Sequence, residues 1–201
     1  MTYKNHFSEK ISNEVAAQLP AIEFQGPIRI IDREEQIEAA CAELRRWPLI
    51  GFDTETRPSF RVGVTFRVSL LQLATPEQCF LFRLNKIPLV KPILQLLEDP
   101  HILKIGADVA GDLRSLRQLR RFREGGFIDL QRIAPEWGIE EKSLRKLSAI
   151  VLGKRVSKAQ RLSNWEAATL TDKQQLYAAT DAWVCIRIYN QLLKTSKNKN
   201  S

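Results

Sequence analysis

Long apolar runs are missing from this sequence. No stretch of about 18 or more consecutive apolar residues occurs, so no segment is expected to span a membrane. The opening residues, MTYKNHFSEK, are polar and lack the apolar centre of a signal peptide. We therefore expect an intracellular, cytoplasmic domain that is monomeric and has no membrane partner.

Histidine and cysteine are also scarce. The two histidines are His6, near the start of the chain, and His101, just before an expected strand, so no Ser/His/Asp catalytic set is evident. The three cysteines, Cys41, Cys79 and Cys185, are far apart and embedded in apolar stretches. This odd number and wide spacing predict reduced, buried thiols and argue against a zinc site or a disulfide framework.

The sequence does contain enough apolar material for one core, together with an excess of positive charge. Its 201 residues are 44% hydrophobic, which suits a single domain. Lysine and arginine number 31 against 23 aspartates and glutamates, giving a net charge of +8. This excess suits an anionic partner such as nucleic acid or an acidic membrane surface, although many basic proteins bind neither.

Hydrophobic periodicity and turn residues predict an α/β fold. The expected strands are 49–54, 67–74, 78–84, 102–107 and a short 127–130, and 28–31 is a candidate for one more. The expected helices are 8–19, 33–47, 88–97, 109–122, 142–152 and 171–194. This order indicates a mixed five-stranded sheet with helices on both faces. The domain would span 28–194, with a peripheral extension at 1–27 and a disordered tail at 195–201.

Two acids end the apolar strand in the run LIGFDTET at 49–56. Asp53 and Glu55 are two positions apart, so on a strand both side chains face the same side. Adjacent carboxylates repel one another unless a cation neutralises them, and their oxygens suit Mg²⁺ or Mn²⁺. A D-x-E pair is also common at exposed strand ends, so the metal hypothesis depends on acids elsewhere.

Further acids lie on two expected helices. Asp108 is explained as an ordinary N-cap of the helix 109–122 or as a partner of its dipole, whereas Asp112 lies too far inside that helix for capping to explain it. The last helix carries Tyr177 and Asp181, which are four residues apart and share a face among apolar neighbours. A buried aspartate needs a partner, and a hydrogen bond from the tyrosine or a buried arginine would also satisfy it.

Basic residues flank these acids. Five arginines interleave with leucines along 113–123 and form either a solvated face or a track for phosphates. In the polar loop 154–165, Lys158 and Arg161 are candidates for phosphate contacts, although a plain surface loop would have the same composition. Asp129, at another strand end, is interpreted as a residue that supports a metal ligand or the fold, rather than as a metal ligand itself.

Four carboxylates from these segments suit phosphodiester hydrolysis assisted by two divalent cations. One ion activates the attacking water and the other stabilises the leaving oxygen, so no serine or cysteine nucleophile is required. The acids that supply such a site are Asp53, Glu55, Asp112 and Asp181.

Three motifs in this order resemble those of the DEDD (DnaQ-like) 3′–5′ exonuclease superfamily, which has a ribonuclease H-like fold. They are FDTET at 52–56, IGADVAGD at 105–112 and LYAATDA at 176–182. The Tyr177-x₃-Asp181 spacing resembles the tyrosine subclass, because the histidine subclass carries a histidine at the position of Leu176. Across 28–193 the sequence is similar to Werner-type exonuclease domains, with RVSLLQL, QCFLF and LSNW in support, and nearly as similar to ribonuclease D.

The resemblance implies a role for each matching residue. Asp53 would bridge two Mg²⁺ or Mn²⁺ ions, and Glu55 and Asp181 would complete the site of the ion that holds the attacking water. Asp112 would help to hold the second ion, partly through water. Tyr177 would orient the nucleophilic water, and the products would be nucleoside 5′-monophosphates.

The resemblance also implies a nucleic-acid substrate. Phe60 and Leu113 would wedge the terminal base, with core packing as the alternative for Leu113. DNA 3′ ends are the preferred substrate, and the alternatives are RNA 3′ ends, as for ribonuclease D, or a catalytically silent nucleic-acid-binding relative. The helicase of animal Werner-type proteins and the helper domains of ribonuclease D do not fit in 201 residues. We therefore expect a stand-alone, prokaryote-like catalytic domain, and any separate helicase or repair partner is unknown.

Overall fold

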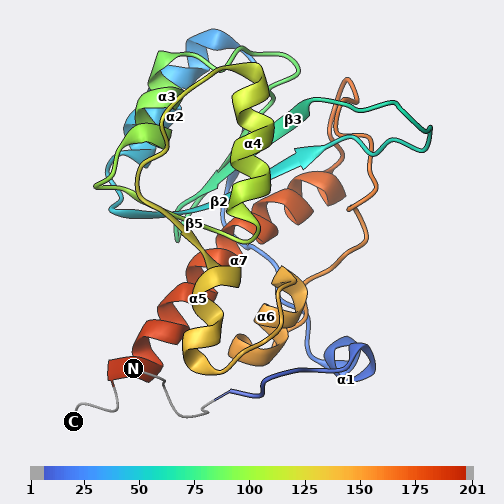
Figure 1. The fold of residues 1–201 in the computed structure, drawn as a ribbon. Coiled ribbons are helices and arrows are strands. Elements are labelled where there is room, and N and C mark those ends of the chain that lie inside the picture. The colour runs from blue at the N-terminus through green and yellow to red at the C-terminus, as the bar shows by residue number, and fades with distance from the viewer. Residues whose placement is uncertain (1–6, 198–201) are drawn as a thin grey trace.

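The computed structural model describes residues 7–197 (Figure 1). Residues 1–6, which include His6, and residues 198–201 of the expected tail lie outside the described residues. The last helix, α7 (Asp172–Lys197), continues into the stretch that the sequence predicts to be disordered. Residues 195–197 are therefore helical.

A six-stranded mixed sheet forms the centre of the domain, in the order β1–β4–β3–β2–β5–β6. The strands are β1 (Ile28–Ile31), β2 (Leu49–Thr56), β3 (Val68–Ala74), β4 (Cys79–Phe82), β5 (Leu103–Gly106) and β6 (Phe127–Asp129). The strands β2, β3 and β4 form an antiparallel meander, whereas β1 pairs in parallel with β4, β5 with β2, and β6 with β5. The predicted count of five strands is one too low, because the short candidate 28–31 pairs with the edge of the hairpin.

Helices cover both faces of the sheet, as predicted (Figure 1). One layer contains α2 (Ile37–Leu44), α3 (Lys91–Glu98) and α4 (Val109–Leu119), and the other contains α7. Along β3, Leu71 and Leu73 face the first layer, while Leu70 and Ala74 face α7. The remaining helices are α1 (Asn13–Gln18), α5 (Leu130–Ile133), α6 (Leu144–Leu152) and the 3₁₀ turns Glu34–Gln36 and Ala134–Trp137. Within residues 7–197, every helix is too short or too polar to cross a lipid bilayer.

Small residues allow α7 to lie close against β2. A Cβ atom added at Gly51 would lie 1.9 Å from the carbonyl oxygen of Ala182, so a larger residue at this position would push the helix away. Ala178 and Ala182 are fully buried in the same layer. This close packing determines how near Asp181 on α7 comes to Asp53 on β2.

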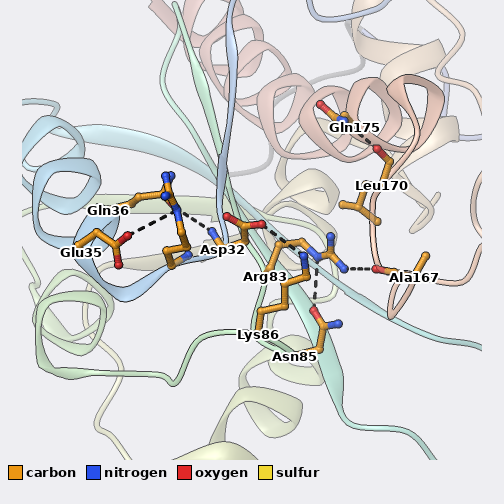
Figure 2. Close-up of polar contacts among 10 residues, drawn as sticks. Asp32, Glu35, Gln36, Arg83, Asn85, Lys86, Ala167, Leu170 and Gln175 are labelled. Carbon is orange, nitrogen blue, oxygen red and sulfur yellow. Dashed lines mark hydrogen bonds and ion pairs between the residues drawn. The ribbon is translucent and has the colours of Figure 1, made fainter.

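The segment that leads into α7 is anchored by a buried arginine (Figure 2). Arg83, which follows β4, is 1% exposed, and its guanidinium donates hydrogen bonds to the carbonyl oxygen of Ala167 and to Asn85 Oδ1. Nearby, Lys86 Nζ pairs with Asp32 Oδ2 at 3.3 Å and ties the end of the hairpin to the turn after β1. The loop before α7 is thus fixed to the end of β4, which lies at the same end of the sheet as Asp53 and Glu55 on β2.

The start of α7 has the predicted capping box. The Gln174 N–H donates to Thr171 Oγ1 at 3.3 Å, and Gln174 Oε1 accepts from the Thr171 N–H at 3.0 Å. Gln175 Nε2 also donates to the carbonyl oxygen of Leu170 at 2.8 Å (Figure 2). These bonds fix where the helix begins, and therefore where the residues on its first turns point.

The N-terminal stretch 7–27, expected to be peripheral, packs along the domain. Its Phe24 is 4% exposed, and the Phe24 N–H donates to Thr180 Oγ1 at 3.1 Å. The Ile22 N–H donates to the carbonyl oxygen of Arg155 at 3.0 Å. This stretch therefore supports α7 one residue before Asp181.

Candidate active site

Three carboxylates converge where the end of β2 faces α7. One oxygen atom each from Asp53, Glu55 and Asp181 lies within 4.8 Å of the other two. Strand alternation directs Asp53 and Glu55 to the same side, and the close approach of α7 at Gly51 brings Asp181 to them. The structure thus assembles three of the four predicted acids.

Asp112 reaches the same region from the opposite layer. The pairing of β5 with β2 ends at Gly51 and Ile105, so the edge of β2 beyond that point is open toward the start of α4. Thr54 points to the α4 side because it alternates with its acidic neighbours, and its hydroxyl donates to Asp112 Oδ1 at 2.6 Å. Burial, and after it the charge of Asp53, raises the pKa of Asp112.

Burial raises the pKa of all four carboxyl groups, and repulsion from neighbouring carboxylates adds to it for Asp53, Glu55 and Asp112. Burial is the largest cause in each case, and it raises the pKa of Asp181 to about 7, that of Asp112 to about 8 and that of Glu55 to about 10. The pKa of Asp53 is raised well above its ordinary range by burial and by repulsion from Asp181. The cluster therefore retains protons near neutral pH, and a bound cation would displace them.

The donor atoms of this cluster fit divalent cations. Asp112 Oδ2 and Asp181 Oδ1 are buried and accept no hydrogen bond from any described residue. Leaving carboxylate oxygens buried without a partner is costly. Because Mg²⁺ and Mn²⁺ prefer such hard oxygen ligands, the residues present suit these ions.

Tyr177 lies one helical turn before Asp181, as its spacing predicts. A hydrogen bond from Tyr177 lowers the pKa of Asp181 and partly offsets the effect of burial. Burial and the nearby carboxylates raise the pKa of Tyr177 above its ordinary value, so its phenol stays neutral. Its ring packs near that of Trp165, with the ring centroids 6.0 Å apart. This hydroxyl can orient a hydrogen-bonded group, but it does not act as a phenolate base.

Of the four residues predicted to contact the substrate, two line a cavity beside the acids, one is exposed in a loop and one is buried in the core. A cavity of about 350 Å³ is lined by Lys158, Arg161, Tyr177 and Asp181, so both basic residues lie at the mouth of the acid cluster. Phe60 is 82% exposed in the loop between β2 and β3. Leu113 is 5% exposed within the core beneath α4, and core packing accounts for it.

Asp129 has a structural contact at the edge of the cluster, in line with its interpretation from the sequence. Its Oδ1 accepts from the Gln131 N–H at 2.9 Å and from the Asp108 N–H at 3.3 Å. Asp108 occupies the N-cap position of α4, but its side chain makes no capping hydrogen bond, contrary to expectation. The reason is its left-handed backbone, with φ 63°, which directs the carboxylate toward Gly111 instead.

The comparisons with known proteins agree with this geometry. The sequence model of a 3′–5′ exonuclease family matches residues 28–197. The chain belongs to this family. The mouse bifunctional 3′–5′ exonuclease/ATP-dependent helicase WRN is 34% identical over 184 residues, which cover 87% of this chain but only 13% of the mouse protein.

Two solved structures have the same fold. The Aedes aegypti Nibbler EXO domain superposes with a TM-score of 0.80 at 22% identity, covering 89% of this chain and 94% of that domain. Trypanosoma brucei RNase D in complex with RNA U12 has a TM-score of 0.72 at 25% identity, covering 84% of this chain and 63% of that one. The predicted ribonuclease H-like α/β fold is confirmed.

Thr54 is the site residue that sequence reasoning missed. In the sequence motif, Thr54 lies between the two acids, and nothing in the motif indicates that its side chain has a role of its own. Alternation along β2 shows that it points away from Asp53 and Glu55. Only the placement of α4 on that face reveals that its hydroxyl meets Asp112.

Proposed function

We propose that this chain is a 3′–5′ exonuclease that hydrolyses phosphodiester bonds at nucleic-acid 3′ ends with the help of two divalent cations. The convergence of Asp53, Glu55 and Asp181 within 4.8 Å is the observation that carries this conclusion. Asp112, with an unpartnered oxygen, completes the set. Membership of the 3′–5′ exonuclease family supports the direction of cleavage.

Each acid has a defined place in this proposal. Asp53 would bridge the two ions, Glu55 and Asp181 would complete the first site, and Asp112 would complete the second. When bound, the ions supply positive charge to the attacking and leaving oxygens of the phosphodiester. Thr54 holds the Asp112 carboxylate in its orientation through the 2.6 Å hydrogen bond.

The remaining residues position the reactants. The neutral Tyr177 hydroxyl, next to Asp181, would orient the attacking water by a hydrogen bond. Lys158 and Arg161 line the adjoining cavity, where they would contact a phosphate of the substrate. The exposed ring of Phe60 would stack against a base, and the products would be nucleoside 5′-monophosphates.

DNA is the preferred substrate in this proposal, and RNA is the alternative. The preference for DNA rests on the resemblance of the sequence motifs to Werner-type exonuclease domains. The likeness to an RNase D solved with RNA U12 supports RNA. A silent nucleic-acid-binding module is less well supported, because a binding protein gains nothing from carboxylates that repel one another.

We also propose that the chain acts as a monomer in the cytoplasm. Support for a reducing compartment comes from Cys41, Cys79 and Cys185, which are buried and free.

The experiment that tests the proposed function is a cleavage assay on 5′-labelled single-stranded DNA and RNA of matched sequence. Mn²⁺, Mg²⁺ or EDTA is added in parallel, and the products are separated by length. We expect a metal-dependent ladder that shortens from the 3′ end on DNA. A ladder on RNA alone would assign the ribonuclease D-type substrate, and binding without cleavage of either would indicate the silent module.

A further inference from the structure

A second groove begins on the Asp112 side of the acid cluster. It has a volume of about 620 Å³ and lies between α4 and the edge strand β6. Ala110, Arg114 and Arg117 line it from one face of α4, and Arg132 lines it from α5. Asp129 marks the end nearest the acids, because its carboxylate accepts from the Asp108 N–H at 3.3 Å and the Asp108 carbonyl accepts from the Asp112 N–H. The groove therefore runs away from the candidate active site along α4.

The acidic residues of this groove already have partners. Glu124 forms an ion pair with Arg117, whose guanidinium also lies 5.6 Å from the centre of the Phe122 ring. The Asp129 carboxylate accepts two backbone N–H groups. The negative charge in the groove is thus compensated without the two other arginines.

Arg114 and Arg132 are the charged residues lining this groove that have no partner among residues 7–197. Both are exposed, and neither makes an ion pair or a hydrogen bond with any residue in 7–197. They come from separate helices and line the same groove. A guanidinium presents a planar set of donors that matches two phosphate oxygens, so a pair of free guanidiniums in one groove suits a phosphodiester backbone.

Arg120, on the same arginine-rich helix, has a different role. Its Nη1 donates to the carbonyl oxygen of Leu89 at 3.3 Å and so ties the end of α4 to the loop before α3. The sequence left open whether the arginines of 113–123 form a solvated face or a phosphate track. The structure shows that these arginines have different roles. Arg114 lines the groove, whereas Arg120 stabilises the fold through its hydrogen bond to Leu89.

We propose that the groove between α4 and β6 binds the phosphate backbone of the substrate strand upstream of its 3′-terminal nucleotide, with Arg114 and Arg132 as the phosphate contacts. This inference rests on the proposed function, since it requires a nucleic-acid 3′ end at the acid cluster. A strand whose 3′ end lies beside Asp112 can leave along α4 into this groove. Binding there strengthens the hold on long substrates without changing the chemistry at the acids.

The test compares Arg114→Glu and Arg132→Glu with a matched charge reversal, Arg29→Glu. Arg29 lines a separate cavity between β1 and α2 and is remote from the acids in the strand order. Cleavage kinetics are measured on an oligonucleotide of about 20 nucleotides and on one of about three, at several salt concentrations. Binding of the long oligonucleotide is measured in EDTA by fluorescence anisotropy, and thermal melting checks that each variant is folded.

For the long substrate, we expect each groove variant to raise KM about tenfold with kcat unchanged. The dependence of log KM on log salt should fall by about one unit for each lost phosphate contact. The short substrate, which does not reach the groove, and the Arg29→Glu control should behave as the wild type does. Unchanged KM on the long substrate, or an equal loss on both lengths, would overturn the proposal.

The anisotropy measurement keeps this test separate from that of the proposed function. If the wild type cleaves nothing, the exonuclease assignment fails, but the groove is still tested by binding. Weaker binding in the groove variants alone would support the groove. Equal binding by all three variants and the wild type, or no binding by any of them, would refute it.

Discussion

Thr54 on β2 donates a 2.6 Å hydrogen bond to Asp112 on α4, and this bond joins the two layers of the candidate active site. The acids Asp53 and Glu55 flank Thr54 in sequence but face the other side of the sheet, toward α7. The three residues 53–55 at the end of β2 therefore orient carboxylates on both faces of the sheet. Asp112 depends on this hydroxyl because its other carboxylate oxygen has no partner among residues 7–197.

Replacing Thr54 with valine tests this coupling. Thr54→Val keeps the shape of the side chain but removes the donor, and because that hydrogen bond lowers the pKa of Asp112, the carboxyl would retain its proton to higher pH. We expect cleavage to fall about tenfold at limiting Mn²⁺, with partial recovery at high Mn²⁺. Thr54→Ser, which restores the hydroxyl, should behave like the wild type. Equal rates for the valine and wild-type proteins at every Mn²⁺ concentration would show that Asp112 is oriented by other contacts.

Tyr177→Phe separates the hydroxyl of this residue from its ring. The ring packing near Trp165 should survive, because phenylalanine has the same shape there. Loss of the hydroxyl should slow cleavage about a hundredfold, since the attacking water would no longer be oriented. Calorimetric titration with Mn²⁺ should give an affinity close to that of the wild type. A variant that cleaves at the wild-type rate would assign Tyr177 a packing role alone.

The raised carboxyl pKa values predict a pH dependence of stability in the metal-free protein. The folded state keeps protons that the unfolded state releases, so the free energy of unfolding should fall as pH rises from the ordinary carboxyl range toward the folded pKa values of about 7 for Asp181 and about 8 for Asp112. Lys104, whose pKa burial lowers to about 8, acts in the opposite direction only above that pH. The fall in the free energy of unfolding is therefore expected between about pH 5 and about pH 8.

Thermal melting in this window provides the measurement. In EDTA, Tm should decrease with pH, whereas Mn²⁺ binds the deprotonated cluster, so the Tm difference between Mn²⁺ and EDTA should widen as pH rises. Asp53→Asn, which removes one of the repelling charges, should flatten the trend in EDTA. A Tm in EDTA that is constant or increases across the window would refute the electrostatic description of the cluster.

Gly51→Ala should uncouple α7 from β2. A Cβ at this position would lie 1.9 Å from the Ala182 carbonyl oxygen, so the helix must shift to accept it. We expect a loss of about 1–3 kcal/mol in the free energy of unfolding, together with weaker Mn²⁺ binding, because Asp181 would move away from Asp53. Gly63→Ala is the matched control: no atom lies within 4 Å of its added Cβ, although its φ of 78° adds some strain. Equal Mn²⁺ affinity in the two variants would contradict the proposed role of the close approach.

The strongest sequence predictions came from local periodicity. Alternation along a strand places Asp53 and Glu55 together, and the helical repeat places Tyr177 with Asp181. The capping box at Thr171 and the helix stop at Gly153, with φ 62°, follow equally local rules. Each of these patterns is complete within a few residues, so no knowledge of the tertiary fold is needed to find it.

The remaining features depend on contacts between distant segments. The helix predicted at 33–47 is shorter in the structure. A 3₁₀ turn at Glu34–Gln36 precedes α2, and α2 ends at Leu44. The strand 28–31 is too short to recognise without its partner β4. The bond between Thr54 and Asp112 joins residues 58 positions apart. Sequence patterns identify residue types, whereas these contacts are set by how the layers pack.

The most direct test of the two-metal site is the cleavage of 5′-labelled DNA by the wild type and by Asp53→Ala, each in Mn²⁺ and in EDTA. Asp53 would bridge both ions, so we predict that the variant loses cleavage while its melting curve in EDTA shows a folded protein at least as stable as the wild type. Wild-type cleavage from the 3′ end should require Mn²⁺. Cleavage by Asp53→Ala at the wild-type rate, or wild-type cleavage undiminished in EDTA, would contradict the assignment of these carboxylates to a catalytic metal site.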